Sequence, residues 1–385
     1  MIPYGRQDIT QVDIDAVTAV LHSDFLTQGP MVPHFEQIIA KRVNVKYAVA
    51  VNSATSALHI ACLALGVGPN DLLWTVPNTF VASANCARYC GADVDFVDID
   101  QNTWNMSVQR LKEKLAQAKV ENRLPKVLVP VHFSGQPTEQ EALWELAQEY
   151  GFKIIEDASH AIGGSRNNEP VGSCRWSDIT IFSFHPVKIV TTGEGGLALT
   201  NDSELSERMT MLRSHGITRN EEKFIKPNNS PWYYEQQILG FNYRMTDIQA
   251  GLGVSQIFRL DDYIKRRNEL ADRYNLSLKG LPIQLPEVSK ENYSAYHLYV
   301  VRLRLDELSK SHQQIFEELR GNGIGVNLHY MPVHLQPYYR NFGFEAGDFP
   351  EAEAHGKEAI TLPLYPAMSN EEQDQVIFAL EKALS

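Results

Sequence analysis

The sequence predicts an α/β protein, with a large domain built on a mostly parallel sheet and a smaller α+β domain after it. Short apolar runs rich in β-branched residues alternate with amphipathic helical stretches over about the first 245 residues, and the pattern changes near Thr246. Strands separated by helices pair in parallel, because a parallel neighbour needs a long crossover connection. Hydrophobic residues are 43% and charged residues 21% of the 385, which excludes a disordered or fibrous chain.

Seven apolar runs are predicted as strands because each is short and is bounded by polar or turn-forming residues. They are YAVAV (47–51), LLWTV (72–76), VDFVD (94–98), KVLVPVH (126–132), KIIED (153–157), ITIFSF (179–184) and GLALT (196–200). The helices predicted among them are SATSALHIACLAL (53–65), FVASANCARYC (80–90), SVQRLKEKLAQA (107–118), TEQEALWELAQEY (138–150) and SELSERMTMLRSH (203–215). In such sheets ligands bind beyond the carboxyl ends of the strands, so chemistry is expected just after each run.

The second half of the chain has a different pattern, which predicts domains at residues 1–245 and 246–385. It reads as a long helical stretch at 246–278, the apolar run YHLYVVRLRL (296–305), a helix at 311–323, the run IGVNLHY (324–330) and a closing helix at 369–384. The polar segment 219–232 is rich in turn-forming residues and is predicted to be a surface loop.

Charge and composition exclude several classes of function. There are 35 Lys and Arg against 47 Asp and Glu, a net charge of −12, which disfavours nucleic-acid binding. No apolar stretch reaches the ~20 residues of a membrane helix, and the start lacks the features of a signal peptide, so we expect a cytoplasmic protein that binds no membrane. The four cysteines form no CxxC pair, and without an HExxH motif no metal site is expected.

Asp157 is the first candidate for chemistry, since it ends the run KIIED. A carboxylate at a strand end can bind a ligand, and it can equally cap the next helix. Asp157 alone leaves both interpretations open.

Lys188 is the second candidate, in the connection HPVKIVTTGEGG that follows ITIFSF. Its neighbours Phe184, Pro186 and Val187 are apolar, and burial among such residues lowers the pKa of an ammonium group. A neutral amine is a nucleophile toward a carbonyl carbon. The alternative is an ordinary surface lysine, which the apolar neighbours disfavour.

The third candidate is the start of the helix after YAVAVN, where Ser53, Thr55 and Ser56 open an apolar helix. Free backbone N–H groups and the helix dipole make such an N-terminus a phosphate site, and the hydroxyls could add donors. A simple N-cap by Ser53 is the alternative. There is no GxxxxGK[ST] motif and no GxGxxG after a strand, so ATP and dinucleotide sites are not expected.

A loop lysine, a strand-end carboxylate and a helix N-terminus are together the groups that pyridoxal 5′-phosphate (PLP) requires. The lysine bonds the aldehyde carbon, the carboxylate keeps the pyridine nitrogen protonated, and the helix holds the phosphate. The sequence therefore predicts a PLP site.

Four strings resemble the sugar aminotransferases of the DegT/DnrJ/StrS family. They are NSATSAL (52–58), EDASHA (156–161), FSFHPVKIVTTGEGG (182–196) and GFNYRMTDIQAGLG (240–253). The resemblance extends from FLTQGPMVPHFE (25–36) to LPLYP (362–366), which is nearly the whole chain. It implies the aspartate-aminotransferase-like fold of fold type I PLP enzymes and a homodimer with active sites at the subunit interface. Ser159 is a slight departure, since alanine is more usual there.

The resemblance also implies roles for individual residues. Lys188 bonds the cofactor and moves the proton, and Asp157 pairs with the pyridinium nitrogen. The further cofactor-binding residues implied are Ala54, Thr55, Phe80, His160, Ser183 and, from the neighbouring subunit, Asn242. Candidates for substrate binding are Tyr4, Gln28, His329 and Tyr330. Phe80 could instead be core, His160 a helix histidine and Asn242 a turn residue, and Arg244 could form an ion pair or bind a substrate anion.

Some family members carry histidine at the lysine position and dehydrate their substrates, so Lys188 implies amino transfer. The strings are most similar to those of family members in pseudaminic acid biosynthesis. This implies a ping-pong transfer from L-glutamate to C4 of a UDP-4-keto-6-deoxy-N-acetylhexosamine. The alternatives are an aminotransferase for another keto-sugar nucleotide, a PLP-binding regulator without turnover, and a cofactor-free lyase that uses Lys188 alone.

Overall fold

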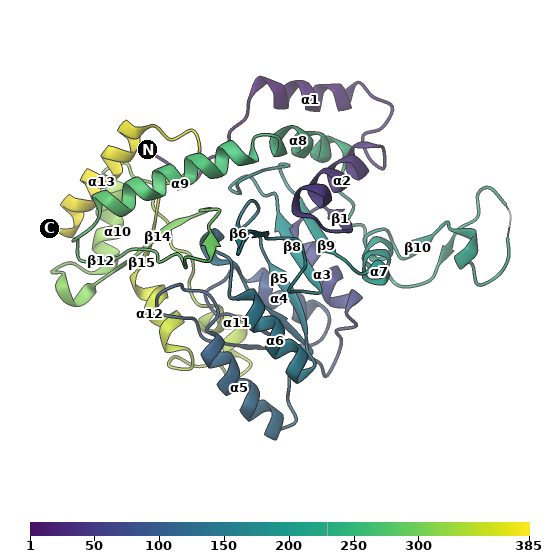
Figure 1. Cartoon of the computed structure of the whole chain (residues 1–385), viewed down its shortest axis with the longest axis horizontal. Coiled ribbons are helices and arrows are strands. Elements are labelled where there is room, and N and C mark those ends of the chain that lie inside the picture. The colour runs from purple at the N-terminus through teal and green to yellow at the C-terminus, as the bar shows by residue number, and fades with distance from the viewer. Residues whose placement is uncertain (229) are drawn as a thin grey trace.

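The computed structural model describes residues 1–228 and 230–385, and a seven-stranded sheet in the order β1-β9-β8-β5-β4-β2-β3 lies at its centre (Figure 1). Its strands are β1 (Tyr47–Val51), β2 (Leu72–Thr75), β3 (Asp93–Phe96), β4 (Val127–Val129), β5 (Lys153–Asp157), β8 (Ile179–Ser183) and β9 (Gly196–Thr200). β9 pairs antiparallel with β1 and β8, whereas the other neighbours in this sheet pair in parallel. The prediction of an α/β fold with a mostly parallel sheet is confirmed.

The reversed direction of β9 has a local cause. Residues 184–195, all of them described, join β8 to β9 without a helix or strand. Parallel neighbours need a crossover, usually through a helix, so a chain that turns back without one pairs antiparallel. This connection carries Lys188 along the carboxyl edge of the sheet.

Helices cover both faces of the sheet. Those in the first part of the chain are α1 (Gln11–Leu21), α2 (Met31–Val43), α3 (Ala54–Ala64), α4 (Ala82–Tyr89), α5 (Val108–Val120), α6 (Gln140–Tyr150) and α7 (Ser203–Arg213). Alternate side chains of a strand point to opposite faces. Val49, Val51 and Ile181 accordingly pack in one cluster with α3, while Ala50 and Phe182 pack in another with α2.

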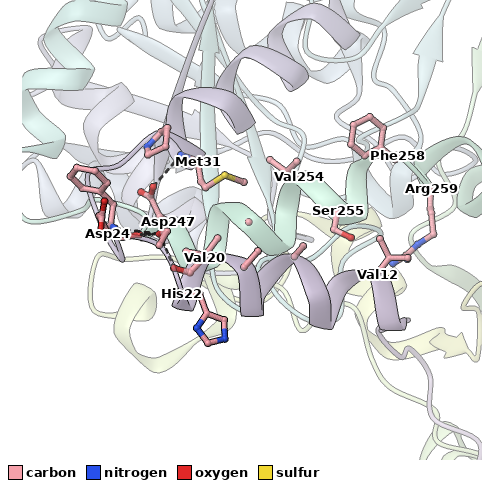
Figure 2. Close-up of a pocket in the computed structure, with 16 residues that line it drawn as sticks. Val12, Val20, His22, Asp24, Met31, Asp247, Val254, Ser255, Phe258 and Arg259 are labelled. Atoms are coloured by element: carbon pink, nitrogen blue, oxygen red, sulfur yellow. Dashed lines mark hydrogen bonds between the residues drawn. The ribbon is translucent and has the colours of Figure 1, made fainter.

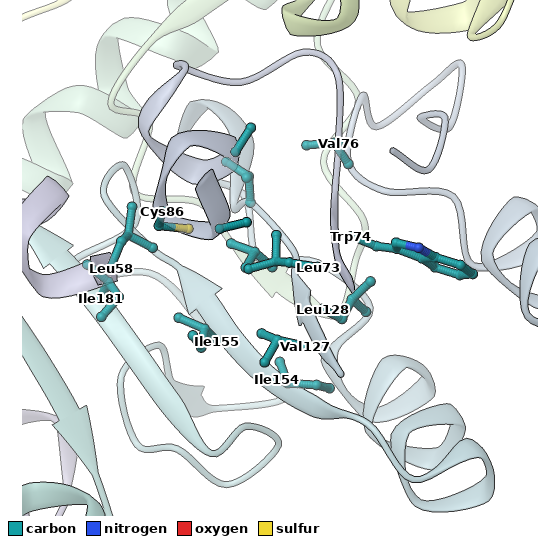
Figure 3. Packing of buried hydrophobic residues seen from close by; sticks show 14 of the residues in the cluster. Leu58, Leu73, Trp74, Val76, Cys86, Val127, Leu128, Ile154, Ile155 and Ile181 are labelled. Carbon is teal, nitrogen blue, oxygen red and sulfur yellow. The ribbon is translucent and has the colours of Figure 1, made fainter. Parts of the chain in front are cut away.

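The larger apolar cluster fixes the strands in place (Figure 3). Leu73, Val127 and Ile155 come from three neighbouring strands and pack with Leu58 of α3 and Cys86 of α4. All five side chains are at most 1% exposed. Burial of a large aliphatic side chain contributes about 1.5–3 kcal/mol, so this cluster holds the strand ends in register.

A second, three-stranded antiparallel sheet has the order β12-β14-β15 and its own apolar cluster. Its strands are β12 (Ile283–Gln284), β14 (Tyr299–Leu303) and β15 (Ala359–Leu362), and the helices in this part of the chain are α8 (Asp247–Ile257), α9 (Leu260–Ser277), α10 (His312–Gly321), α11 (Pro337–Arg340), α12 (Pro350–Glu358) and α13 (Asn370–Leu384). Ile2 packs into this cluster from the N-terminal end of the chain. The division into domains at residues 1–245 and 246–385 stays a proposal.

The predicted helix at 246–278 is wrong in one respect, because Phe258 and Arg259 separate α8 from α9. The guanidinium of Arg259 donates to the Asp13 carboxylate at 2.6 Å, which ties this break to α1. α8 packs on α1 and α2, whereas α9 runs on toward α13 (Figure 1). Because α8 and α9 pack on different helices, the chain must bend between them, and the helical periodicity of the sequence does not reveal this bend.

Two further hairpins are small. β6 (Ser165–Arg166) pairs with β7 (Glu169–Pro170) and with β13 (Asn292–Tyr293). β10 (Ile217–Thr218) and β11 (Glu235–Gln236) pair in a segment that projects from the body of the molecule (Figure 1). We call residues 217–228 and 230–239 the arm. The predicted surface loop 219–232 lies in the arm. Residue 229 of this loop lies outside the described residues.

Among the described residues, the helices are either too short or too polar to cross a bilayer.

Candidate active site

The three candidate features meet in one cavity of about 750 Å³ at the carboxyl edge of the central sheet. Ala54 follows β1, Asp157 ends β5 and Lys188 follows β8, and all three line the cavity. These strands run in the same direction, so their carboxyl ends share an edge. The volume falls in the usual range of small-molecule sites.

Most of the predicted site residues line this cavity. Those that do are Tyr4, Ala54, Thr55, Phe80, Asp157, His160, Ser183, Lys188, His329 and Tyr330. Gln28, Asn242 and Arg244 are not part of its lining. The lining residues that the sequence did not reveal include Asn52, Thr79, Ser159, His185, Glu194, His297 and Asn327. Thr79 and Asn327 lie within two residues of predicted positions, whereas His297 has no local signal.

Asp157 is buried and is held by two donors. The Ser83 hydroxyl donates to Oδ2 at 2.6 Å, and the backbone N–H of Ser159 donates to Oδ1 at 3.1 Å. The segment after β5 is a series of turns, so Asp157 does not cap a helix. Its carboxylate lines the cavity instead.

Lys188 is half-buried, and its surroundings favour the neutral amine. Burial lowers the pKa of the Lys188 ammonium to about 8, and the nearby Asp157 carboxylate opposes that shift. A lysine with this pKa has a substantial neutral fraction near physiological pH. It can act as a nucleophile and as a carrier of protons.

We expect the cofactor-free chain to bond added PLP faster as the pH rises through about 8, and then at a constant rate, because only the neutral amine attacks. Stopped-flow absorbance across this range measures the rate. Nα-acetyllysine, whose amine has an ordinary pKa, is the control for titration of PLP itself. A rate that tracks the control at every pH would contradict a lowered pKa.

The N-terminus of α3 presents backbone donors to the cavity. Ser53 is the N-cap and accepts from the backbone N–H of Ser56 at 3.1 Å, so the capping alternative is confirmed for Ser53. The Ser56 hydroxyl bonds Asn52 Oδ1 at 2.7 Å and is therefore used within the cap. Ala54 and Thr55 are the first helical residues, and their N–H groups have no carbonyl partner within the helix. They and the Thr55 hydroxyl remain for an anion.

A buried histidine and a tyrosine also line the cavity. Nε2 of His160 lies 3.2 Å from the Tyr330 hydroxyl, and its ring centroid lies 4.5 Å from that of His297. Burial, reinforced by the nearby Lys188 ammonium, holds the pKa of His160 well below its usual value, so the ring is neutral. Within the described part of the chain, Nδ1 of His160 is buried without a hydrogen-bond partner.

Phe80, Tyr4 and His329 complete the lining. Phe80 is 59% exposed at the cavity, so it is not a core residue in this chain. The rings of Tyr4 and His329 lie 5.4 Å apart, and His329 Nδ1 is 2.8 Å from the Thr361 hydroxyl. Burial lowers the pKa of His329 to about 3, so it is neutral as well.

This arrangement fits PLP. The cavity offers a lysine for the aldehyde, a carboxylate for the ring nitrogen and a helix N-terminus for the phosphate. The exposed Phe80 ring and the unpartnered Nδ1 of His160 are two further groups that a bound aromatic ring with polar substituents would complete. Across the described residues, no cluster of His, Cys, Asp and Glu could hold a metal ion.

The fold and the cavity together define a PLP-dependent enzyme. The chain belongs to the DegT/DnrJ/EryC1/StrS aminotransferase family, whose model matches residues 7–381. It is a PLP-dependent sugar aminotransferase with the fold of that class, and its substrates are a nucleotide sugar and an amino donor.

Three similar proteins illustrate the range of the family. The spore coat polysaccharide biosynthesis protein SpsC of Bacillus subtilis is 39% identical over 98% of this chain and 96% of its own length. The UDP-4-amino-4,6-dideoxy-N-acetyl-beta-L-altrosamine transaminase of Campylobacter jejuni is 35% identical over 99% and 98%. The structure of PseC from Helicobacter pylori, an aminotransferase involved in the biosynthesis of pseudoaminic acid, matches with a TM-score of 0.90 and 29% identity over 100% and 99% of the two chains.

Proposed function

We propose that this enzyme transfers the amino group of L-glutamate to C4 of a UDP-4-keto-6-deoxy-N-acetylhexosamine. The products are 2-oxoglutarate and UDP-4-amino-4,6-dideoxy-N-acetyl-β-L-altrosamine, an intermediate of pseudaminic acid biosynthesis. Atoms balance in this exchange. One amino group and one hydrogen replace the keto oxygen of the sugar, which leaves as water, and a second water supplies the keto oxygen of 2-oxoglutarate.

The similarity to the Campylobacter jejuni transaminase over nearly the full length of both chains carries this proposal. The similarity to PseC supports the same choice of substrate. Lys188, half-buried in the cavity with its pKa lowered to about 8, supports amino transfer rather than dehydration.

We assign each group of the cavity one task. Bound PLP supplies an electron sink for the carbon that loses its proton. Lys188 Nζ carries that proton between the substrate carbon and the cofactor carbon, which requires the neutral amine that burial favours. Asp157 would hold a positive charge at the ring nitrogen, and Phe80 would cover the ring face. Ala54, Thr55 and Ser183 would bind the phosphate.

The neutral His160 and the Tyr330 hydroxyl face the same cavity. Burial raises the pKa of Tyr330, so its hydroxyl stays protonated and can donate to an oxygen of the cofactor or sugar. Tyr4 and His329, whose rings lie 5.4 Å apart at an interplanar angle of 56°, are proposed to contact the sugar nucleotide.

The test of the proposed function is an end-point assay. The purified enzyme is incubated with L-glutamate together with one UDP-4-keto sugar of a panel in each reaction, and the products are identified by mass spectrometry and NMR. We expect 2-oxoglutarate and the β-L-altrosamine product in equal amounts. Rapid turnover of another sugar, with none of the proposed one, would overturn the choice of substrate.

A second candidate is amino transfer to another keto-sugar nucleotide. The identity to SpsC, a spore coat polysaccharide biosynthesis protein, is 39% and thus slightly higher than that to the altrosamine transaminase. Keto sugars that lead to 4-amino-arabinose, viosamine and bacillosamine therefore belong in the same panel.

We also propose that the enzyme is a homodimer in which Asn242 and Gln28 reach the cavity of the partner. Both are exposed and neither lines the cavity of its own chain. They belong to adjoining segments, because Thr27 forms a bridge with Thr246. The Asp247 carboxylate, which follows, accepts the N–H groups of the turn after Gln28. The two segments thus form one surface.

Exposed apolar side chains support self-association. A groove of about 710 Å³ lies between α1 and α8, where Val12 and Phe258 are 64% and 75% exposed (Figure 2). On the arm, Ile225, Trp232 and Leu239 are each about four-fifths exposed. Apolar surface of this extent is usually covered by another protein.

Mixing inactive variants tests the shared site. Lys188→Ala and Asn242→Ala are co-expressed in equal amounts, so that half of the dimers carry one chain of each kind. If Asn242 acts across the interface, one site in each mixed dimer is complete, and about a quarter of the wild-type activity returns. If Asn242 acts within its own chain, the mixture has no more activity than the average of its two parents.

A further inference from the structure

The hydroxyl groups of Thr79 and Ser83 form a row of hydrogen bonds that ends at the Asp157 carboxylate. The Thr79 and Ser83 hydroxyl oxygens are 2.9 Å apart, and Ser83 lies 2.6 Å from Asp157 Oδ2. Thr79 is 2% exposed, Ser83 is fully buried and Asp157 is 6% exposed. The contact between Ser83 and Asp157 joins residues 74 positions apart and is therefore a product of the fold.

The direction of each hydrogen bond in this row is fixed by chemistry. An ionised carboxylate can only accept, so the Ser83 hydroxyl donates its proton to Asp157. Its oxygen is then free to accept from Thr79, whose hydroxyl proton points to Ser83. Hydrogen bonds to a charged acceptor are the stronger class, so Ser83 has one preferred orientation.

Ser83 does not touch the cavity, although its neighbours do. It lies in the first turn of α4, while Thr79, Phe80 and Ala82 of the same segment line the cavity. The backbone N–H of Ser83 donates to the Phe80 carbonyl at 3.3 Å, which closes this turn. One short segment therefore positions both the Phe80 ring at the cavity and the Ser83 hydroxyl that donates to Asp157.

We propose that Ser83 is a positioning residue, which holds the Asp157 carboxylate in the orientation that binds the pyridine nitrogen of PLP. The inference rests on the proposed role of Asp157. Without Ser83, the backbone N–H of Ser159 is the one donor that the described residues offer to the carboxylate, at Oδ1. The side chain then rotates more freely, and the ring nitrogen loses part of its partner.

The affinity for PLP tests the proposal. We expect Ser83→Ala to raise the dissociation constant, measured by absorbance titration of the cofactor-free chain, about 10-fold, the usual effect of a lost hydrogen bond to a charged group. Ser83→Cys keeps a weaker donor of similar shape, and we expect an intermediate value. The visible absorption maximum of the bound cofactor should shift in Ser83→Ala, since the partner of the ring nitrogen has moved.

Ser177→Ala is the matched control. Ser177 is buried and donates to the Glu156 carboxylate at 3.1 Å, and Glu156 precedes Asp157 on β5 and points to the opposite face of the sheet. We expect this variant to lose stability, measured by thermal unfolding of the cofactor-free chain, but to keep the wild-type affinity and absorption maximum. An effect on PLP equal to that of Ser83→Ala would show that any loss of packing near β5 suffices, and would overturn the proposal.

A double-mutant cycle separates the two proposals. In the background of Asp157→Ala, Ser83→Ala should have no further effect on the dissociation constant, because its effect passes through Asp157. If Asp157→Ala weakens binding while Ser83→Ala does not, the role of Ser83 is wrong and the role of Asp157 stands. If Asp157→Ala binds PLP as the wild type does, the proposed role of Asp157 fails, and the role of Ser83 fails with it.

Discussion

Lys188→Ala is expected to lower the rate of amino transfer about 1,000-fold or more at saturating L-glutamate. Lys188 has two tasks in the proposed mechanism, bonding the cofactor and carrying the proton, and loss of a positioned proton carrier alone costs about 10²–10⁴-fold. PLP should still bind, because the proposed phosphate site at α3 and the Asp157 carboxylate are unchanged. Stopped-flow absorbance with glutamate and then with the keto sugar measures both halves of the reaction.

Small amines provide a direct check on that interpretation. Added methylamine should restore part of the rate in Lys188→Ala, since a free amine can enter the cavity and carry the proton. Lys114→Ala is the control. Lys114 is also a partly buried lysine and pairs with Asp95 at 2.8 Å, but it does not line the cavity. Full turnover by Lys188→Ala would exclude the mechanism and favour a different base.

Much of the central sheet could be predicted because its strands are nearly continuous apolar runs. β1, β5 and β9 have the predicted bounds, and β8 differs by one residue. Such strands are buried on both faces, so their composition alone marks them. The helices α1 and α2 escaped prediction. α1 reads QVDIDAVTAVL, in which apolar and polar residues alternate in part as they do in a strand. The capping box of Thr10 and Asp13 and the packing on α8 favour the helix.

The site was predictable to the extent that its residues follow strands of the central sheet. Asp157 and Lys188 do, and so does the N-terminus of α3. His297 does not, because it enters the cavity from the segment before β14, and no local pattern links that segment to β5 or β8. Ser83 is a harder case. Its chemistry depends on a contact with Asp157 across the core, and nothing within its own segment distinguishes it from an ordinary helix residue.

Asp157→Asn is expected to have the second largest effect, a loss of about 100-fold or more in the rate of amino transfer. The amide has nearly the shape of the carboxylate but carries no charge, so it cannot hold a proton on the ring nitrogen. A preorganised charge of this kind typically contributes about 10²–10³-fold to a rate. Rapid-mixing measurements at saturating substrates should show the loss in the rate constant rather than in the Michaelis constants.

Glu156→Gln is the matched control for that experiment, since Glu156 is the preceding residue on β5 and its side chain points away from the cavity. Burial raises the pKa of Glu156, but hydrogen bonds and charge from His132, with bonds from Gln140 and Thr180, more than offset this and bring the pKa below its usual value. The carboxylate is thus charged and fully bonded in the folded chain, and its replacement should lower the thermal midpoint. The rate of amino transfer at a temperature below that midpoint should stay near the wild-type value. A comparable loss of rate in both variants would mean that the strand, and not the charge at Asp157, is what the reaction requires.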